Sequence, residues 1–322
     1  MSIVIAFRAK KLKNFKGFLN SFTPAIILLL SIFSYFYMTL LLDRFILVFP
    51  LDFILVGHFL AVLGFQQIYI FRVKRDKSSE NENEKQIIEK SAKDFTPQQE
   101  GGRKALHLLG FLLVPPYFGM GLWYYNILRV ILDFFNAPPM NINPEYIPQT
   151  IALLGILTAF IFVMVPELYR MFKPNYCMLQ RFIHILREDE INALGPHVNM
   201  ICGVLIPIIL IPEPFLAVGT MLSIIIADGA ASVIGKKWGK RIFNKKNNKT
   251  YEGLFAGIAT NFLVSFIFYI IQYPVWQCLI FSGTCCIIFG VLDYISFNIS
   301  DNILNPVISG IAIALISNAL LL

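Results

Sequence analysis

The sequence has few charged residues for its length and no pattern of cysteine and histidine that is typical of a metal site. Charged residues make up 15% of the 322 residues, whereas about 25% is usual for soluble domains. The five cysteines (Cys177, Cys202, Cys278, Cys285 and Cys286) form no CxxC pair and no ligand spacing with histidine. These features exclude an ordinary soluble domain and give no support to a structural zinc site or a disulfide framework.

Apolar residues are abundant instead. They make up 57% of the chain, and the mean hydropathy is +0.66. A helix needs about 20 apolar residues to cross a bilayer, and the sequence predicts an all-α, polytopic membrane protein with about nine such helices. The expected spans are 22–42, 45–70, 105–123, 147–166, 198–212, 215–235, 253–271, 275–295 and 303–322. Residues 123–138 are amphipathic, so we expect them at the membrane interface or re-entering the membrane.

The net charge of +7 is concentrated in a few segments. Five Lys and Arg fall in 1–21, nine in 72–104, four in 167–197 and seven in 236–252, which together hold 25 of the 27. With nine spans, all four segments lie on one side of the membrane, which the positive-inside rule assigns to the cytosol. We therefore expect the positive charge to set the topology and not to bind nucleic acid.

The order of apolar spans and charged segments predicts the domain organisation. Residues 1–71 hold two transmembrane helices, and the first is expected to be retained because its apolar stretch is too long for a signal peptide. Residues 72–102 form a polar cytosolic loop of mixed charge that we expect to be mobile. Residues 103–322 form the main membrane domain.

The stretch ADGAASVIGKKWGKRIFNKKNNKTYEG, residues 227–253, places a carboxylate, glycines and lysines at one membrane edge. If the span continues as a helix, Asp228, Ala231, Gly235 and Gly239 share one face, because their spacings are three and four. Side chains on that face are small, so a ligand or another backbone can approach closely. The glycine spacing does not match a P-loop, and no Ser or Thr follows the lysine pair.

Basic side chains follow this face, and Thr250 stands where it can N-cap the next span. Lysines, helix N-terminal amides and carboxylates together are the ingredients of a site for polyphosphate and Mg²⁺. The alternative is that the basic loop only sets the topology and the small residues only pack helices. The basic residues are Lys236, Lys237, Lys240, Arg241, Lys245, Lys246 and Lys249.

Three further polar clusters are expected on the same side. Each has an ordinary explanation when taken alone, as a snorkelling basic residue, an i,i+3 ion pair or a helix cap. Their convergence with 227–253 on one face favours a site. The clusters are Arg103-Lys104-x-x-His107; Glu167 and Arg170 with Arg187-x-x-Glu190 and Gly195; and Asp301-Asn302 with Pro306 and Gly310.

Taken together, these residues resemble the CTP-dependent lipid-alcohol kinases, a family that includes dolichol kinase, phytol kinase and the CTP-dependent diacylglycerol kinase. The nucleotide motif of that family, D-x-x-A-x-x-x-G-x-x-x-G followed by K-[ST]-x-E-G, matches Asp228 to Gly239 and Lys249 to Gly253. The other three clusters resemble its R-K-x-x-H, R-x-x-E and D-N motifs. The resemblance covers about 103–322, and one departure is Asp293, where a glutamate would be expected.

The resemblance implies transfer of the CTP γ-phosphoryl group to a membrane lipid alcohol, with Mg²⁺ or another divalent cation. It implies catalytic roles for Asp228, Lys249 and Glu252, with Asp228 and Glu252 as metal ligands. Phosphoryl transfer mainly requires positioning and charge neutralisation, which these residue types can supply. The residues implied in nucleotide binding are Gly235, Lys236, Lys237, Gly239, Lys240, Thr250, Gly253, Asp301, Asn302, Arg187, Glu190, Arg103, Lys104 and His107.

Several alternatives stay open. A phosphatidate cytidylyltransferase also uses CTP and a membrane lipid, and a transporter or scaffold would also cross the membrane many times. A transporter would favour repeats and polar groups near the midplane, and the sequence has neither. Among lipid alcohols we favour a polyprenol or dolichol over phytol or diacylglycerol. The expected location is the endoplasmic reticulum membrane in a eukaryote and the cytoplasmic membrane in a prokaryote. Nothing in the sequence indicates an oligomeric state.

Overall fold

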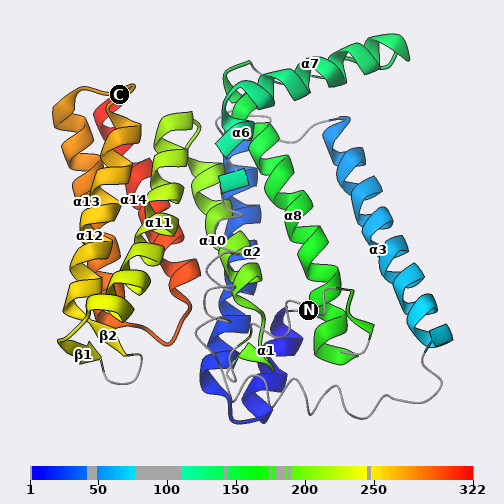
Figure 1. The fold of residues 1–322 in the computed structure, drawn as a ribbon. Coiled ribbons are helices and arrows are strands. Elements are labelled where there is room, and N and C mark those ends of the chain that lie inside the picture. The colour runs from blue at the N-terminus through cyan, green and yellow to red at the C-terminus, as the bar shows by residue number, and fades with distance from the viewer. Residues whose placement is uncertain are drawn as a thin grey trace.

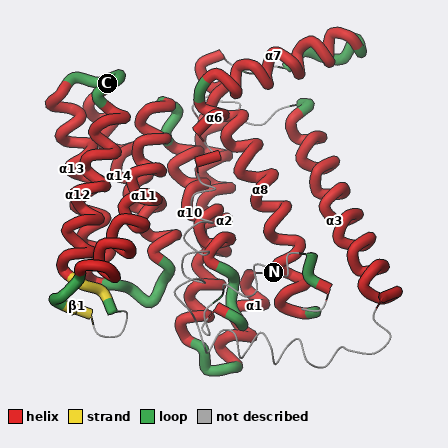
Figure 2. Tube along the Cα trace, in the orientation of Figure 1, coloured by secondary structure: helices red, strands yellow, loops and turns green. Residues whose placement is uncertain are grey.

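The computed structural model is a helical bundle. It describes residues 2–41, 49–76, 111–112, 114–140, 142, 144–173, 176–178, 186, 190–244 and 248–321. Nearly all of these residues are helical, and the strands that are described form one small antiparallel hairpin (Figure 2). The prediction of an all-α membrane protein is confirmed.

The N-terminal half of the bundle is built around two long helices, α2 (Phe15–Leu41) and α8 (Ile147–Phe172), which lie side by side with α10 (Figure 1). Its elements are α1 (Ser2–Lys11), α2 (Phe15–Leu41), α3 (Leu51–Asp76), α6 (Val114–Tyr117), α7 (Gly119–Phe134), the 3₁₀ turn η2 (Pro144–Tyr146) and α8 (Ile147–Phe172). Helix α3 lies at the edge and is tied to α8, because His58 Nε2 lies 3.1 Å from Thr158 O and Gln67 donates to the Tyr169 hydroxyl.

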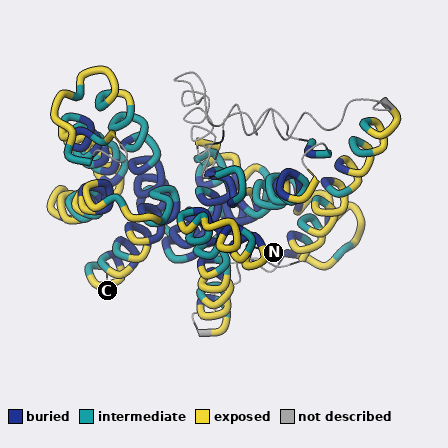
Figure 3. The backbone as a smooth tube through the Cα atoms, turned by 90° about the horizontal axis from the view of Figure 1, so that it is seen from below, coloured by how far each residue is buried: buried dark blue, intermediate teal, exposed yellow. Residues whose placement is uncertain are grey.

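The C-terminal half consists of five helices and a short hairpin that lies at one end of them (Figure 1). Its elements are α10 (Pro196–Leu210), α11 (Pro214–Trp238), β1 (Ile242–Asn244), β2 (Lys249–Thr250), α12 (Tyr251–Tyr269), α13 (Val275–Ile295) and α14 (Asp301–Leu321). Helix α10 is almost wholly buried between the two halves. Seen along the bundle, buried residues gather at the centre and exposed residues line the outside (Figure 3), which is the arrangement expected where apolar side chains face lipid.

Seven of the described helices are long and apolar enough to cross a membrane: α2, α3, α8, α11, α12, α13 and α14. The expected span 198–212 is α10, whose 15 residues are shorter than the other spans. The expected span 105–123 is not confirmed, because residues 105–110 and 113 lie outside the described part. The remainder divides at Phe118 into α6 and α7. The count of nine is therefore not confirmed.

Helix α7 runs across the end of the bundle opposite the hairpin instead of along it (Figure 1). It exposes Trp123, Val130 and Phe134. An exposed apolar face on a helix that lies across the bundle agrees with the interfacial position expected for 123–138.

The described parts of the four basic segments lie at one end of the bundle. Helix α1, the C-terminal ends of α3 and α8, and the hairpin all occupy the same end in Figure 1. Arg129, on α7, lies at the other end. The loop 72–102 falls mostly outside the described residues, so the expected domain boundaries stay a prediction.

Glycine lets α14 approach α10 closely. A Cβ on Gly203 would lie 2.4 Å from Asn302 O, and one on Gly310 would lie 2.9 Å from Pro207 Cβ. Small residues at such crossings allow backbones in a membrane to pack directly. These contacts fix the start of α14, which carries Asp301 and Asn302, against the buried helix α10.

Candidate functional site

A cavity of about 220 Å³ lies at the basic end of the bundle, where α11 ends and α12 and α14 begin. Nine of the residues implied by the sequence line it. They come from four separate stretches of the chain and are Glu190, Asp228, Gly235, Lys236, Lys249, Thr250, Gly253, Asp301 and Asn302. Members of three of the four predicted clusters therefore meet at this cavity.

Helix α11 supplies the first wall. It continues past Asp228 to Trp238, as predicted, so Asp228, Ala231 and Gly235 face the cavity together. Gly239 ends the helix, with its amide donating to Gly235 O. A Cβ on Gly239 would lie 2.5 Å from Thr250 Oγ1, so the glycine here accommodates the start of α12.

The hairpin and the start of α12 supply the second wall. Strands β1 and β2 turn the chain back toward α11, and Thr250 caps α12 by accepting a hydrogen bond from Gly253 N at 3.2 Å. The predicted cap is confirmed. The Tyr251 amide donates to Arg241 O, so two amides of this helix terminus already have partners within the chain. Gly253 and Gly257 serve packing, because added Cβ atoms would lie 2.7 Å from Ala231 O and 2.6 Å from Phe289 Cε1.

Lys249 is the central cation of the cavity. Its ammonium donates to Asp293 Oδ1 at 2.7 Å and to Asp301 Oδ2 at 3.1 Å. Burial by itself would lower the pKa of Lys249, but the negative charges of Asp301 and Asp293 outweigh burial and raise it above its usual value. Lys249 therefore stays charged at neutral pH and cross-links α13 to α14.

Asp293 is a site residue whose role the sequence left open. It stands on the last turn of α13 and lines the cavity beside Lys249. Glu252, expected as a metal ligand, is not among the lining residues. Both its carboxylate oxygens lie 3.3 Å from the Arg241 amide, because the hairpin carries that amide over the first turn of α12.

The remaining expected residues fall elsewhere. Lys237 and Lys240 do not line the cavity, and Lys237 Nζ lies 4.7 Å from the centre of the Trp238 ring. Arg103, Lys104, His107 and Arg187 lie outside the described residues.

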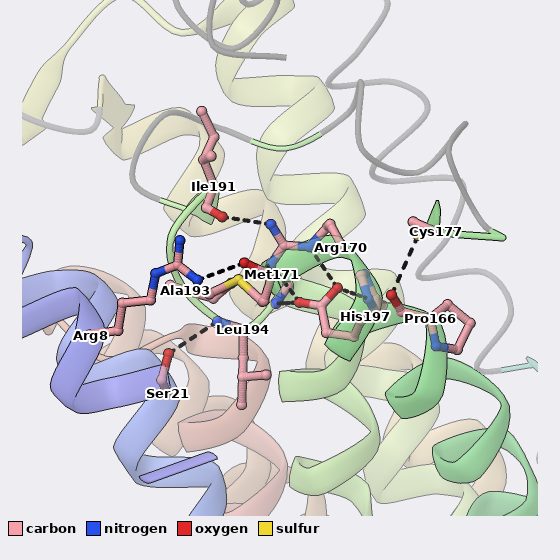
Figure 4. A network of polar contacts seen from close by, with 12 residues as sticks. Arg8, Ser21, Pro166, Arg170, Met171, Cys177, Ile191, Ala193, Leu194 and His197 are labelled. Carbon is pink, nitrogen blue, oxygen red and sulfur yellow. Dashed lines mark hydrogen bonds and ion pairs between the residues drawn. The ribbon is translucent and has the colours of Figure 1, made fainter. Parts of the chain in front are cut away.

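A buried ion pair holds the segment that delivers Glu190. Arg170 donates to both carboxylate oxygens of Glu167, at 2.8 and 2.7 Å, and also to the carbonyls of Ile191 and Ala193 (Figure 4). Glu167 Oε1 also accepts from Gly195 N at 2.7 Å. A bidentate pair with further backbone partners satisfies both buried charges. The i,i+3 pair expected from the sequence thus fixes residues 190–195 against α8.

Helix α2, which lies outside the region of resemblance, also reaches the cavity. Lys16 and Asn20 line it, and Asn20 Oδ1 accepts a hydrogen bond from Ser300 N at 2.8 Å. That bond fixes the residue directly before Asp301. No motif marks either residue, so no local sequence signal would have found them.

The lining of the cavity carries slightly more negative than positive charge, so a polyphosphate could bind there only together with a cation. Three lysines (Lys16, Lys236 and Lys249) face four carboxylates (Glu190, Asp228, Asp293 and Asp301). Lysines alone do not balance both these carboxylates and a nucleotide triphosphate. The described residues contain no cluster of three or more His, Cys, Asp or Glu arranged to hold a metal. Mg²⁺ needs no such cage, since it is commonly held by one or two carboxylates and by substrate phosphates.

An unsatisfied side chain supports the same fit. Asn199 on α10 is 3% exposed and lines the cavity, and its Oδ1 has no hydrogen-bond partner within the described structure. A buried amide oxygen without a partner costs about 1–3 kcal/mol. A donor from a bound ligand, or a cation with its waters, would satisfy it.

No family model matches the chain, and no solved structure matches it. Three curated proteins are similar over part of their length. Dolichol kinase of Saccharomyces cerevisiae is 28% identical over 216 residues, which is 63% of this chain and 34% of that protein. Dolichol kinase sec59 of Schizosaccharomyces pombe is 28% identical over 146 residues, covering 42% and 28%. Dolichol kinase EVAN of Arabidopsis thaliana is 25% identical over 153 residues, covering 45% and 25%.

The chain matches about a third or less of the length of each of these relatives. Its similarity to them agrees with the family that the motifs resemble. The protein is an all-α, multi-pass membrane protein with a charged cavity at one end, and its sequence is similar to those of dolichol kinases.

Proposed function

We propose that this protein transfers the γ-phosphoryl group of CTP to the hydroxyl of a membrane lipid alcohol, a polyprenol or dolichol. One observation carries the proposal. Four stretches that resemble kinase motifs, and that span residues 190–302, meet at one cavity at the end of a membrane bundle. A site in that place can take a water-soluble nucleotide from one side and a lipid hydroxyl from the other.

The roles follow from the positions. Lys249 and Lys236 neutralise the phosphates, with Lys16 as a third cation from α2. Asp301 and the amide oxygen of Asn302 would hold Mg²⁺, and Asp228 would either join them or accept the alcohol proton. The cation would neutralise charge on the phosphates when bound. Glu252 is not assigned to the metal in this scheme, because its carboxylate is directed to the Arg241 amide.

The alcohol oxygen forms a bond to the γ-phosphorus while the bond from that phosphorus to the β,γ-bridging oxygen breaks. CDP leaves, and the alcohol proton passes to a carboxylate, for which Asp228 is our candidate. The chain's contribution is to align the two oxygens and to balance charge, which accounts for most catalysis of phosphoryl transfer.

We further propose that the cavity faces the cytosol. The basic segments at its end of the bundle support this orientation through the positive-inside rule. In a eukaryote the membrane would be the endoplasmic reticulum, and in a prokaryote the cytoplasmic membrane.

The test uses purified full chain in micelles with γ-labelled CTP, ATP or GTP. Dolichol, a polyprenol, phytol and diacylglycerol are offered in parallel. We expect label in the polyprenol-type lipid with CTP, and its loss on addition of EDTA. Label in phytol or diacylglycerol alone would reassign the substrate. Pyrophosphate release with phosphatidate, and no labelled lipid, would identify a cytidylyltransferase and overturn the proposal.

A further inference from the structure

A second, smaller cavity adjoins the charged one. It holds about 20 Å³ and lies between α10, α11 and α14. It shares Asp228, Asp301 and Asn302 with the larger cavity. Its other walls are apolar apart from one side chain, and the two cavities together form a charged chamber with a narrow apolar extension.

The apolar walls are suited to hydrocarbon. Val204, Met221 and Ile224 are buried, and Met200 and Ile225 are half-buried. Methionine side chains adapt to irregular apolar groups. The walls are also well fixed, since α14 is held against α10 by the close contacts at Gly203.

Asn305 is the polar exception. It lines the small cavity from α14 and is 2% exposed, and its Oδ1 has no hydrogen-bond partner among the residues that the structure describes. Most buried polar atoms in folded proteins are paired, so an unpaired oxygen beside apolar walls needs a reason. A ligand that brings one hydroxyl donor on an apolar chain would supply the missing partner.

The size restricts that ligand. A space of about 20 Å³ takes roughly one water-sized group. It therefore has room for a hydroxyl at the end of a chain but not for a headgroup.

We propose that this crevice is the acceptor subsite, which takes the terminal CH₂–OH of a long hydrocarbon alcohol and positions it through Asn305. The inference rests on the proposed kinase function and adds the location of the acceptor hydroxyl and a residue that positions it. The hydroxyl donates to Asn305 Oδ1 when it binds beside Asp228 and Asp301. It has a single proton, so this bond is exchanged for one to Asp228 before the transfer.

The test compares two variants on the same helix. In Asn305→Leu we expect the KM for polyprenol to rise at least tenfold, while the KM for CTP stays within twofold of wild type. Ser309→Ala is the matched control, because Ser309 is also buried, its hydroxyl has no hydrogen-bond partner among the described residues, and it does not line the crevice. We expect it to change neither KM. Removal of a buried unsatisfied amide should not lower the melting temperature of Asn305→Leu.

A second measurement does not depend on catalysis. A polyprenol analogue with a diazirine beside its hydroxyl should crosslink to α10 or α11 near Met200 and Met221, and Met221→Trp, which fills the crevice, should abolish that crosslink. An active wild type whose lipid KM is unchanged by Asn305→Leu would overturn the subsite and leave the kinase intact. If the wild type phosphorylates no lipid but still crosslinks near Met200 and Met221, the proposed kinase function is wrong and the lipid subsite stands. Crosslinking elsewhere would overturn the subsite in either case.

Discussion

Replacing Lys249 by methionine removes the ammonium group that lies between Asp293 and Asp301. Methionine keeps most of the length of the side chain, so the change is mainly one of charge. Removing one partner of a buried ion pair costs about 3–5 kcal/mol, because it leaves an uncompensated charge. The Lys249 side chain is 22% exposed and that of Asp301 is 31% exposed. Because water screens part of the charge that is left, we expect a loss of unfolding free energy at the lower end of that range, about 3 kcal/mol.

If Lys249 neutralises a phosphate, as proposed, turnover should fall further than stability alone explains, by about 100-fold or more. The double variant Lys249→Met/Asp293→Asn separates the two effects. Removing one of the two facing carboxylates should restore a large part of the melting temperature without restoring lipid phosphorylation.

The assays are the melting temperature by tryptophan fluorescence in the same micelles and transfer of label from CTP to lipid. Lys173→Met is the control, since Lys173 is exposed at the same end of the bundle, outside the cavity. We expect it to match wild type in both assays. An unchanged melting temperature in Lys249→Met would refute the ion-pair geometry. Recovered turnover in the double variant would refute a direct role in phosphate binding and leave Lys249 as a structural residue.

Three further predictions concern the same end of the bundle. Thr250→Ala removes the cap on Gly253 N and should cost about 1 kcal/mol in unfolding free energy, whereas Thr250→Ser should keep most of it; equal melting temperatures for the two would contradict the cap. Asn20→Ala frees the Ser300 amide and should lower kcat with little change in the KM for lipid; an unaltered kcat would show that α2 does not support the site. The folded-state pKa of Lys249 is raised, so its stabilisation is complete below the unfolded value of about 10.4 and is lost only as pH rises through the folded pKa. The difference in melting temperature between wild type and Lys249→Met should therefore be constant from about pH 6 to pH 9, and a marked fall within that window would contradict the assigned shift.

The parts of the site that depend on local spacing could be predicted from the sequence. Asp228, Ala231 and Gly235 share a face because α11 keeps its helical period past the carboxylate, and Thr250 caps α12 because a threonine before an apolar run has an amide within reach. The spans α11 to α14 were also predicted, since each is a continuous apolar run between polar turns.

Contacts set by tertiary packing could not be predicted. The pairing of Lys249 with Asp293 depends on how α13 lies against the hairpin, and the pattern of residues around Asp293 carries no sign of it. The position of Glu252 depends on the short hairpin, which brings the Arg241 amide over the start of α12; a two-residue strand has too little periodicity to be recognised. The division at Phe118 was missed although Pro115, Pro116 and Gly119 beside it are residue types that commonly end helices, because the apolar run continues across them.

The bond between Asn20 and Ser300 has a consequence for how the protein is made. These residues are 280 positions apart, and translation proceeds at about 5–20 residues per second. A ribosome therefore spends some tens of seconds between the synthesis of the two. During that interval α2 to α13 can enter the membrane one after another, but the wall formed by Asp301 and Asn302 does not yet exist. A polypeptide released before residue 301 would carry the lysines of the cavity but not this wall, so the cavity can be complete only after Asp301 and Asn302 have been synthesised.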